Sequence, residues 1–160
     1  MKNNSSVLEL VDLLKTKHLT LGSIESLTGG LFAATMTSIP GASKFFKGAL
    51  VTYYTEEKVR LLGLDEDYVN KYGVVNKEVA IGMARNGKTK LATDLAISFT
   101  GNAGPDAMDN QPVGTVFVGI SFKNETNWYL LNLEGDRDSI RNQCVIEGAN
   151  LLISTICKNF

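Results

Sequence analysis

The apolar positions of the chain switch between helical and strand-like spacing. Over residues 7–14 they recur three and four positions apart, which predicts an amphipathic helix capped by Ser5 or Ser6. The run over 19–24 favours a first strand. The segment over 31–38 is apolar nearly all round, which is typical of a buried helix.

The middle of the chain continues this alternation. β-branched and aromatic residues over 49–54 predict a second strand. Thr55 can cap the helix that follows. A short helix over 65–71, a longer one over 76–91 and an apolar strand over 94–100 complete the series.

The pattern changes after a polar loop over 101–113. Two strand-like runs, 114–122 and 128–133, flank a polar turn and predict a hairpin. A last amphipathic helix begins after Asp136. Because helices and strands alternate early and a hairpin comes late, we expect one α/β domain over residues 1–160. Its sheet is predicted to be mixed, mostly parallel and enclosed by helical layers.

Composition narrows the function classes. The chain has 160 residues, of which 44% are hydrophobic, enough for a full core. Lys and Arg (16) nearly equal Asp and Glu (17), so nothing favours a nucleic-acid partner. The first residues lack the apolar core of a signal peptide, and no apolar run could span a bilayer. We therefore expect a cytoplasmic protein without a membrane partner.

Metal-ligating residues are scarce in the sequence. His18 is the only histidine, and Cys144 and Cys157 are the only cysteines and are far from any CxxC spacing. We expect no metal and no cofactor.

Two glycine-bearing loops follow predicted strands. They are Thr28-Gly29-Gly30 and the run from Thr100 through Gly101 to Gly104. Ligands of α/β sheets bind outside the carboxyl ends of strands, where such turns present free N–H groups to phosphate or an oxyanion. Neither loop is a Walker A sequence or a full GxGxxG.

A lysine follows the second predicted strand closely. Lys58 falls in the first turn of a helix, where the positive helix end favours the neutral amine. A neutral lysine can take a proton from a serine hydroxyl. Residue type alone favours a solvated surface lysine beside Glu56 and Glu57, because lysines are mostly exposed.

Several motifs in order resemble the CinA C-terminal domain family. They are ESxTGG, PGASKFFKGALVTY followed by Glu57-Lys58, TGxAGP, PVGTV and GDR, and the likeness runs from about Leu19 to the last helix. The resemblance implies a three-layer α/β/α sandwich. It also implies a metal-independent amidohydrolase, because the enzymatically characterised members are nicotinamide-nucleotide amidohydrolases (PncC). These convert nicotinamide mononucleotide (NMN) to nicotinate mononucleotide and ammonia in pyridine-nucleotide recycling.

The resemblance also implies site residues. The family site is described as a serine–lysine dyad assisted by a tyrosine, which by motif position gives Ser43, Tyr53 and Lys58. Ser26 is the second candidate for the nucleophile. Either glycine loop could hold the oxyanion, and the other the phosphate. The expected substrate-binding residues are Ser26, Thr28, Gly29, Gly30, Thr100, Gly101, Gly104 and Arg137.

Other interpretations stay open at this point. The loop between TGxAGP and PVGTV is often glycine-rich in the family and carries a basic residue. This chain has Asp106 to Gln111 there, a difference that bears on which substrate it binds. A catalytically silent nucleotide-binding module and an amidase for another phosphorylated metabolite are the alternative functions. Arg137 could equally form a structural salt bridge. We expect a homo-oligomer, for which Trp128 on a late strand is one candidate contact.

Overall fold

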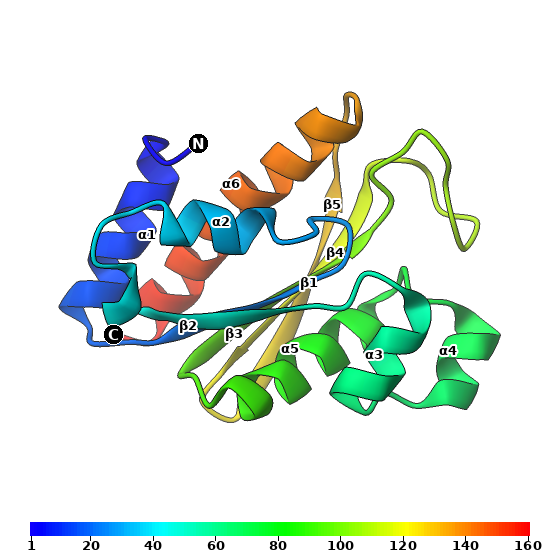
Figure 1. Ribbon diagram of the computed structural model, residues 1–160, viewed down its shortest axis with the longest axis horizontal. Coiled ribbons are helices and arrows are strands. Elements are labelled where there is room, and N and C mark those ends of the chain that lie inside the picture. Colours follow the sequence, from blue (N-terminus) through cyan, green and yellow to red (C-terminus); the bar gives the residue numbers. More distant parts are fainter.

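A five-stranded mixed sheet forms the centre of the computed structural model, which describes all residues 1–160 (Figure 1). The strand order is β2-β1-β3-β4-β5. β2, β1 and β3 run parallel, whereas β3–β4 and β4–β5 are antiparallel. The strands are β1 (Leu21–Glu25), β2 (Phe46–Val51), β3 (Leu95–Gly101), β4 (Thr115–Phe122) and β5 (Glu125–Asn132).

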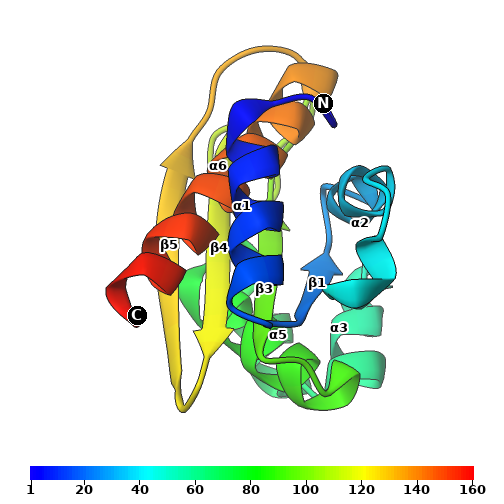
Figure 2. The same cartoon turned by 90° about the vertical axis from the view of Figure 1, so that its left-hand side faces the viewer.

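Helices cover both faces of this sheet (Figures 1 and 2). One layer holds α1 (Ser5–Thr16), α2 (Leu31–Thr37) and α6 (Arg137–Lys158). The other holds α3 (Thr55–Leu62), α4 (Glu66–Tyr72) and α5 (Lys77–Leu91). A 3-10 turn, η1 (Ala42–Lys44), leads into β2. The expected α/β sandwich of three layers is therefore confirmed.

Each face of the sheet has its own core. The larger core joins α1, α2 and α6 to the sheet through fully buried residues such as Leu10, Phe32 and Leu152. The smaller one joins α3, α4 and α5 to Ile24 and Ala96. Helices cover both faces, so every residue of β1 and all but the last residue of β3 are buried, as in parallel sheets covered on both sides.

The structure shifts some predicted boundaries. The second strand begins at Phe46 and ends at Val51, so Tyr53 lies in the connection to α3 and not on a strand. Tyr54 is the N-cap of α3, and Thr55 is its first helical residue. The sheet is also less parallel than predicted, because its four pairings divide evenly between parallel and antiparallel.

Parallel pairing decides which loops meet. Since β1, β2 and β3 point the same way, the loops after Glu25, Val51 and Gly101 leave the same edge of the sheet. The start of α6 lies at this edge as well (Figure 2). None of the helices combines the length and hydropathy that crossing a bilayer would require.

Candidate active site

A cavity of about 130 Å³ opens at the carboxyl-end edge of the sheet. Its walls come from the loop after β1, the connection from β2 to α3, the end of β3 with the following loop, and the first residue of α6. The lining residues that the sequence predicted for the site are Ser26, Tyr53, Lys58, Thr100, Gly101, Gly104 and Arg137.

A buried serine–lysine pair forms the floor of this cavity. Lys58 Nζ lies 2.9 Å from Ser26 Oγ, and the Lys58 side chain is only 1% exposed. Ser26 follows the last residue of β1, and Lys58 is in the first turn of α3. At this distance an ammonium donates to the hydroxyl, and a neutral amine accepts the hydroxyl proton.

The other neighbours of Lys58 Nζ are backbone carbonyls. It donates to Thr52 O at 2.6 Å and to Tyr53 O at 3.5 Å. Carbonyls only accept, so they take the two N–H groups of a neutral amine and leave its lone pair for the Ser26 hydroxyl. Burial lowers the pKa of Lys58 to about 8, with the carboxylate of Asp109 acting in the opposite direction. The arrangement thus supplies a proton acceptor near neutral pH.

Glu25 fixes the turn that carries Ser26. This carboxylate is fully buried and accepts hydrogen bonds from Ser23 Oγ (2.9 Å) and from the backbone N–H groups of Gly30, Phe32 and Ala33 (3.2, 3.0 and 3.0 Å). Both ends of the turn are thereby tied to one side chain. Residue patterns alone assigned Glu25 no role, although its place beside Ser26 in the ESxTGG motif was the available signal.

The glycine pair does not present free N–H groups, contrary to expectation. Gly29 donates to Ser26 O at 3.0 Å, and Gly30, at φ 100°, donates to Glu25. Neither glycine lines the cavity, and Thr28 is fully buried beside it. The positive φ of Gly30 serves the turn into α2. The N–H groups of Leu27 and Thr28 bond to no protein atom, and of these two residues only Leu27 lines the cavity.

The loop after β3 does offer unpaired donors. The N–H groups of Ala103 and Gly104 bond to no protein atom, and both residues line the cavity. Asn102 holds this loop in place, donating to Met108 O and Gln111 O at 3.0 and 3.1 Å and accepting from Met108 N at 3.1 Å. Thr100 is held by donating its hydroxyl to Val74 O at 2.8 Å.

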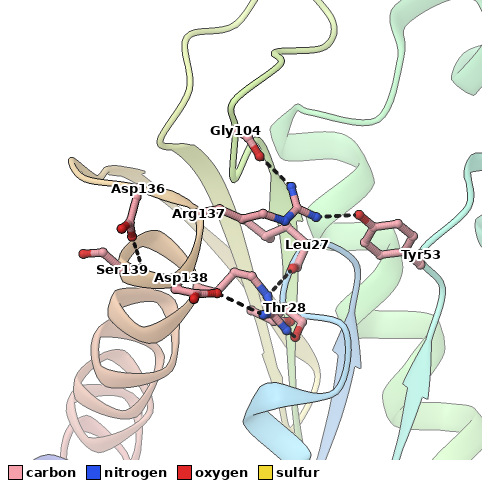
Figure 3. Close-up of polar contacts among 9 residues, drawn as sticks. Leu27, Thr28, Tyr53, Gly104, Asp136, Arg137, Asp138 and Ser139 are labelled. Atoms are coloured by element: carbon pink, nitrogen blue, oxygen red, sulfur yellow. Dashed lines mark hydrogen bonds and ion pairs between the residues drawn. The ribbon is translucent and has the colours of Figure 1, made fainter.

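Arg137 bridges two walls of the cavity (Figure 3). It donates to Gly104 O at 2.6 Å and to Tyr53 Oη at 2.8 Å. Arg137 forms no salt bridge, so the structural role in an ion pair that the sequence left open for it is not observed. The Tyr53 hydroxyl thus contacts Arg137, and only its backbone oxygen approaches Lys58.

A second arginine of α6 supports the loop after β1. Arg141 donates to Leu27 O at 3.1 Å and to Thr28 O at 2.9 Å. In a trans peptide the N–H points opposite to the C=O, so these bonds fix the orientation of two peptide planes next to Ser26. Arg141 Nη1 also lies 4.0 Å from Asp138 Oδ1, so Arg141, unlike Arg137, has a carboxylate partner.

Ser43 lies away from this site, which corrects the expectation that it meets Lys58. It is exposed in η1, immediately before β2, and Phe45 O accepts from Leu21 N at the start of β1. Ser26 follows the end of the same strand. Five strand residues at about 3.3 Å each separate the two ends by roughly 17 Å.

A larger cavity of about 400 Å³ adjoins the first. The two share Thr55, Val74 and Met108 as wall residues. Its own wall includes Asp109, whose carboxylate accepts from the N–H groups of Val74 and Val75 at 2.8 and 2.9 Å. Asp109 therefore braces the segment before α5, a role that the sequence did not indicate.

Metal-ligating residues do not gather anywhere in the chain: no group of three or more His, Cys, Asp or Glu residues could hold an ion. The chemistry that the cavity offers is acid–base and nucleophilic. It combines a hydroxyl, a buried amine of lowered pKa and unpaired backbone donors.

The fold and site define an α/β domain with a buried serine–lysine pair at the carboxyl ends of its parallel strands. The model of the CinA C-terminal domain matches residues 3–156, and the chain belongs to this family. The TM-score is 0.93 with a CinA superfamily protein of Klebsiella pneumoniae, which is 24% identical; the match covers 98% of this chain and 99% of that one. An Escherichia coli member, 26% identical, gives 0.87 and covers 91% and 85%.

Curated relatives are closer in sequence but longer. A Limosilactobacillus fermentum protein, whose name places it among competence-damage inducible proteins, is 44% identical over 150 residues, 92% of this chain and 36% of its own length. A CinA-like protein of Dictyoglomus thermophilum is 42% identical over 144 residues, 89% of this chain and 35% of its own length. The chain thus spans about a third of the curated relatives that it matches.

Proposed function

We propose that this domain is a metal-independent amidohydrolase that converts NMN to nicotinate mononucleotide and ammonia. The observation that carries the proposal is the 2.9 Å contact between Ser26 Oγ and a buried Lys58 Nζ at the floor of a cavity. Ser26, the second candidate from the sequence, replaces Ser43 as the proposed nucleophile because Ser26 is the serine that reaches the amine.

The proposed reaction has two halves. Ser26 Oγ attacks the carboxamide carbon while Lys58 Nζ takes the hydroxyl proton. Lys58 then gives this proton to the leaving nitrogen, ammonia departs, and an ester to Ser26 remains. Water attacks the ester carbonyl, again losing a proton to Lys58, and the carboxylate leaves as Ser26 regains its proton. General-base help of this type contributes about 10²–10⁴-fold.

Backbone donors supply the proposed oxyanion site. The Leu27 N–H immediately follows the nucleophile and is unpaired. The N–H groups of Ala103 and Gly104 on the facing loop are the other candidates. A single donor of this kind contributes roughly 10²–10³-fold in other hydrolases.

The substrate class rests on size, charge and the family resemblance. Ligand pockets measure about 300–1,000 Å³, so the smaller cavity suits the reacting carboxamide and the adjoining 400 Å³ cavity suits the remainder of a nucleotide. The Arg137 guanidinium is matched to a phosphate, and the Asp106 carboxylate in the same wall to a cationic pyridinium ring.

A panel of amides with ammonia detection tests this function. We expect release from NMN, with nicotinate mononucleotide as the second product and no loss of rate in a chelator. Nicotinamide riboside, which lacks the phosphate, is expected to react more slowly. If only a different phosphorylated amide were turned over, that compound would replace NMN as the proposed substrate. Thermal stabilisation by nucleotide without any turnover would favour the silent binding module.

Replacing Glu25 with glutamine is expected to lower kcat for NMN by about 10²-fold with little change in KM, because a misplaced nucleophile loses rate rather than binding. The amide keeps one acceptor oxygen but turns an NH₂ donor toward backbone N–H groups. Glu9→Gln, at an exposed position of α1, is the matched control. Equal kcat in the two variants would remove the positioning role of Glu25.

A further inference from the structure

The strand β5 leaves one long edge of the sheet open. It is the last strand in the sheet order, and it pairs with β4 over eight consecutive residues without a register irregularity (Figure 2). Its sequence, Glu-Thr-Asn-Trp-Tyr-Leu-Leu-Asn, contains no lysine and no proline. Lysine, proline and bulges are features by which proteins prevent edge-to-edge pairing, and the only charged residue of β5 is Glu125 at its first position.

The opposite edge strand, β2, is protected. Its pairing with β1 shifts register between Leu21 and Gly22. It also carries Lys47, whose Nζ donates to Ala92 O at 2.5 Å. The contrast singles out β5 as the edge that remains competent for pairing.

Backbone parity shows which groups of β5 point outward. Leu133 N donates to Gly114 O at 2.8 Å, and this pair continues the β4–β5 register one position beyond Thr115 and Asn132. Hydrogen-bonded pairs alternate along an antiparallel ladder, so the odd-numbered residues of β5 bond to β4. The N–H and C=O groups of Thr126, Trp128, Leu130 and Asn132 therefore face the open edge.

Two large apolar side chains lie beside these groups. Trp128 is 42% exposed and Leu130 is 46% exposed. Both are on the α5 face of the sheet, where the Trp128 ring packs against Phe117 and under Lys77 Nζ. An apolar pair next to unpaired backbone groups fits a strand with apolar side chains of its own.

We infer that β5 pairs antiparallel with β5 of a second copy of this chain, joining two sheets into one of ten strands. A two-fold axis perpendicular to the sheet keeps each face on its own side. When the axis passes at Tyr129, Trp128 lies opposite Leu130 of the second copy, and Thr126 lies opposite Asn132. In this register, each of the four open-edge residues donates one backbone hydrogen bond to the second copy and accepts one from it.

Charge supports a second copy as the occupant. The paired segment 126–132 carries no charged side chain. At each end, the β4–β5 turn of one copy brings Lys123 toward Glu134 of the other, which follows the end of β5, and Glu125 falls opposite Leu133. Like charges directly opposite one another would destabilise the pairing, and this register has none.

Mass measurement in solution tests the interface independently of any catalytic activity. Wild-type protein is expected to be dimeric by light scattering, and Leu130→Lys is expected to have half that mass. Leu8→Lys is the matched control, because Leu8 on α1 is also 46% exposed. It should remain dimeric. A monomeric wild type, a dimeric Leu130→Lys variant or dissociation of both variants would overturn the inference.

Disulfide trapping tests the register without a destabilising charge. Tyr129 sits on the two-fold axis as a pair without backbone hydrogen bonds, whose Cα atoms are about 4.5 Å apart, within reach of a disulfide. Tyr129→Cys in a Cys157→Ser background should form an intermolecular disulfide. Asn127→Cys in the same background faces Leu131 and should not. Equal yields, or no disulfide in either, would contradict this register.

Discussion

Replacing Ser26 with alanine is expected to lower kcat for ammonia release from NMN by about 10³-fold or more, as loss of a nucleophile does in other hydrolases. The hydroxyl is the only nucleophile that Lys58 Nζ reaches. KM should change little, because alanine leaves the cavity wall and its backbone donors in place. Initial rates of ammonia release measure both constants.

Ser43→Ala discriminates between the two serines of the sequence analysis. Ser43 is exposed at the other end of β2, so its variant should retain wild-type kcat. Loss of activity in Ser43→Ala together with full activity in Ser26→Ala would reverse the assignment. Unchanged activity in both would exclude a serine nucleophile at either position.

The amine is expected to control the pH dependence of the reaction. Lys58 accepts the serine proton only when it is neutral, and burial lowers its pKa to about 8. Below that pKa the neutral fraction falls about tenfold per pH unit, so kcat/KM should rise with pH and level off above about pH 8. A profile that is flat between pH 6 and about 8 would contradict this assignment.

Lys58→Met should remove both the rate and its pH dependence. Loss of general-base help is expected to cost about 10²–10⁴-fold. Methionine fills a similar volume without a buried charge, so the melting temperature should not fall. Lys90→Met, at an exposed position of α5, is the control and should keep the wild-type profile. Residual activity that still titrates near pH 8 would indicate a different base.

Most of the fold could be predicted from local patterns. Asp136 and the helical spacing after it predicted α6, and the helix expected over 76–91 is α5, whose N-cap is Asn76. Side-chain caps and apolar periodicity are local properties, so the sequence shows them directly. The second strand was predicted three residues too late in the sequence, at 49–54 where the structure has Phe46–Val51. Its true start is set by the pairing of Phe46 with Leu21, a contact between residues distant in the sequence.

The site was harder to predict than the fold. Lys58 was found by its place in the first turn of α3, although the sequence alone favoured a surface residue. Glu25 and Asn102 were missed because their role is to hydrogen-bond backbone groups of the neighbouring loops. Those backbone groups belong to residues five to nine positions away in the sequence. Nothing local distinguishes such a carboxylate or amide from a solvated one.

The sequence by itself determined the family, the order of the elements and the polar side chains from which a site could be made. Only the tertiary structure decided that Ser26, and not Ser43, meets Lys58, and that the glycine pair is bonded internally. Parallel pairing places the ends of β1 and β2 together, so a serine after one strand meets a lysine after the other. A serine before β2 lies a strand length away, and that separation depends on strand direction, which residue patterns do not specify.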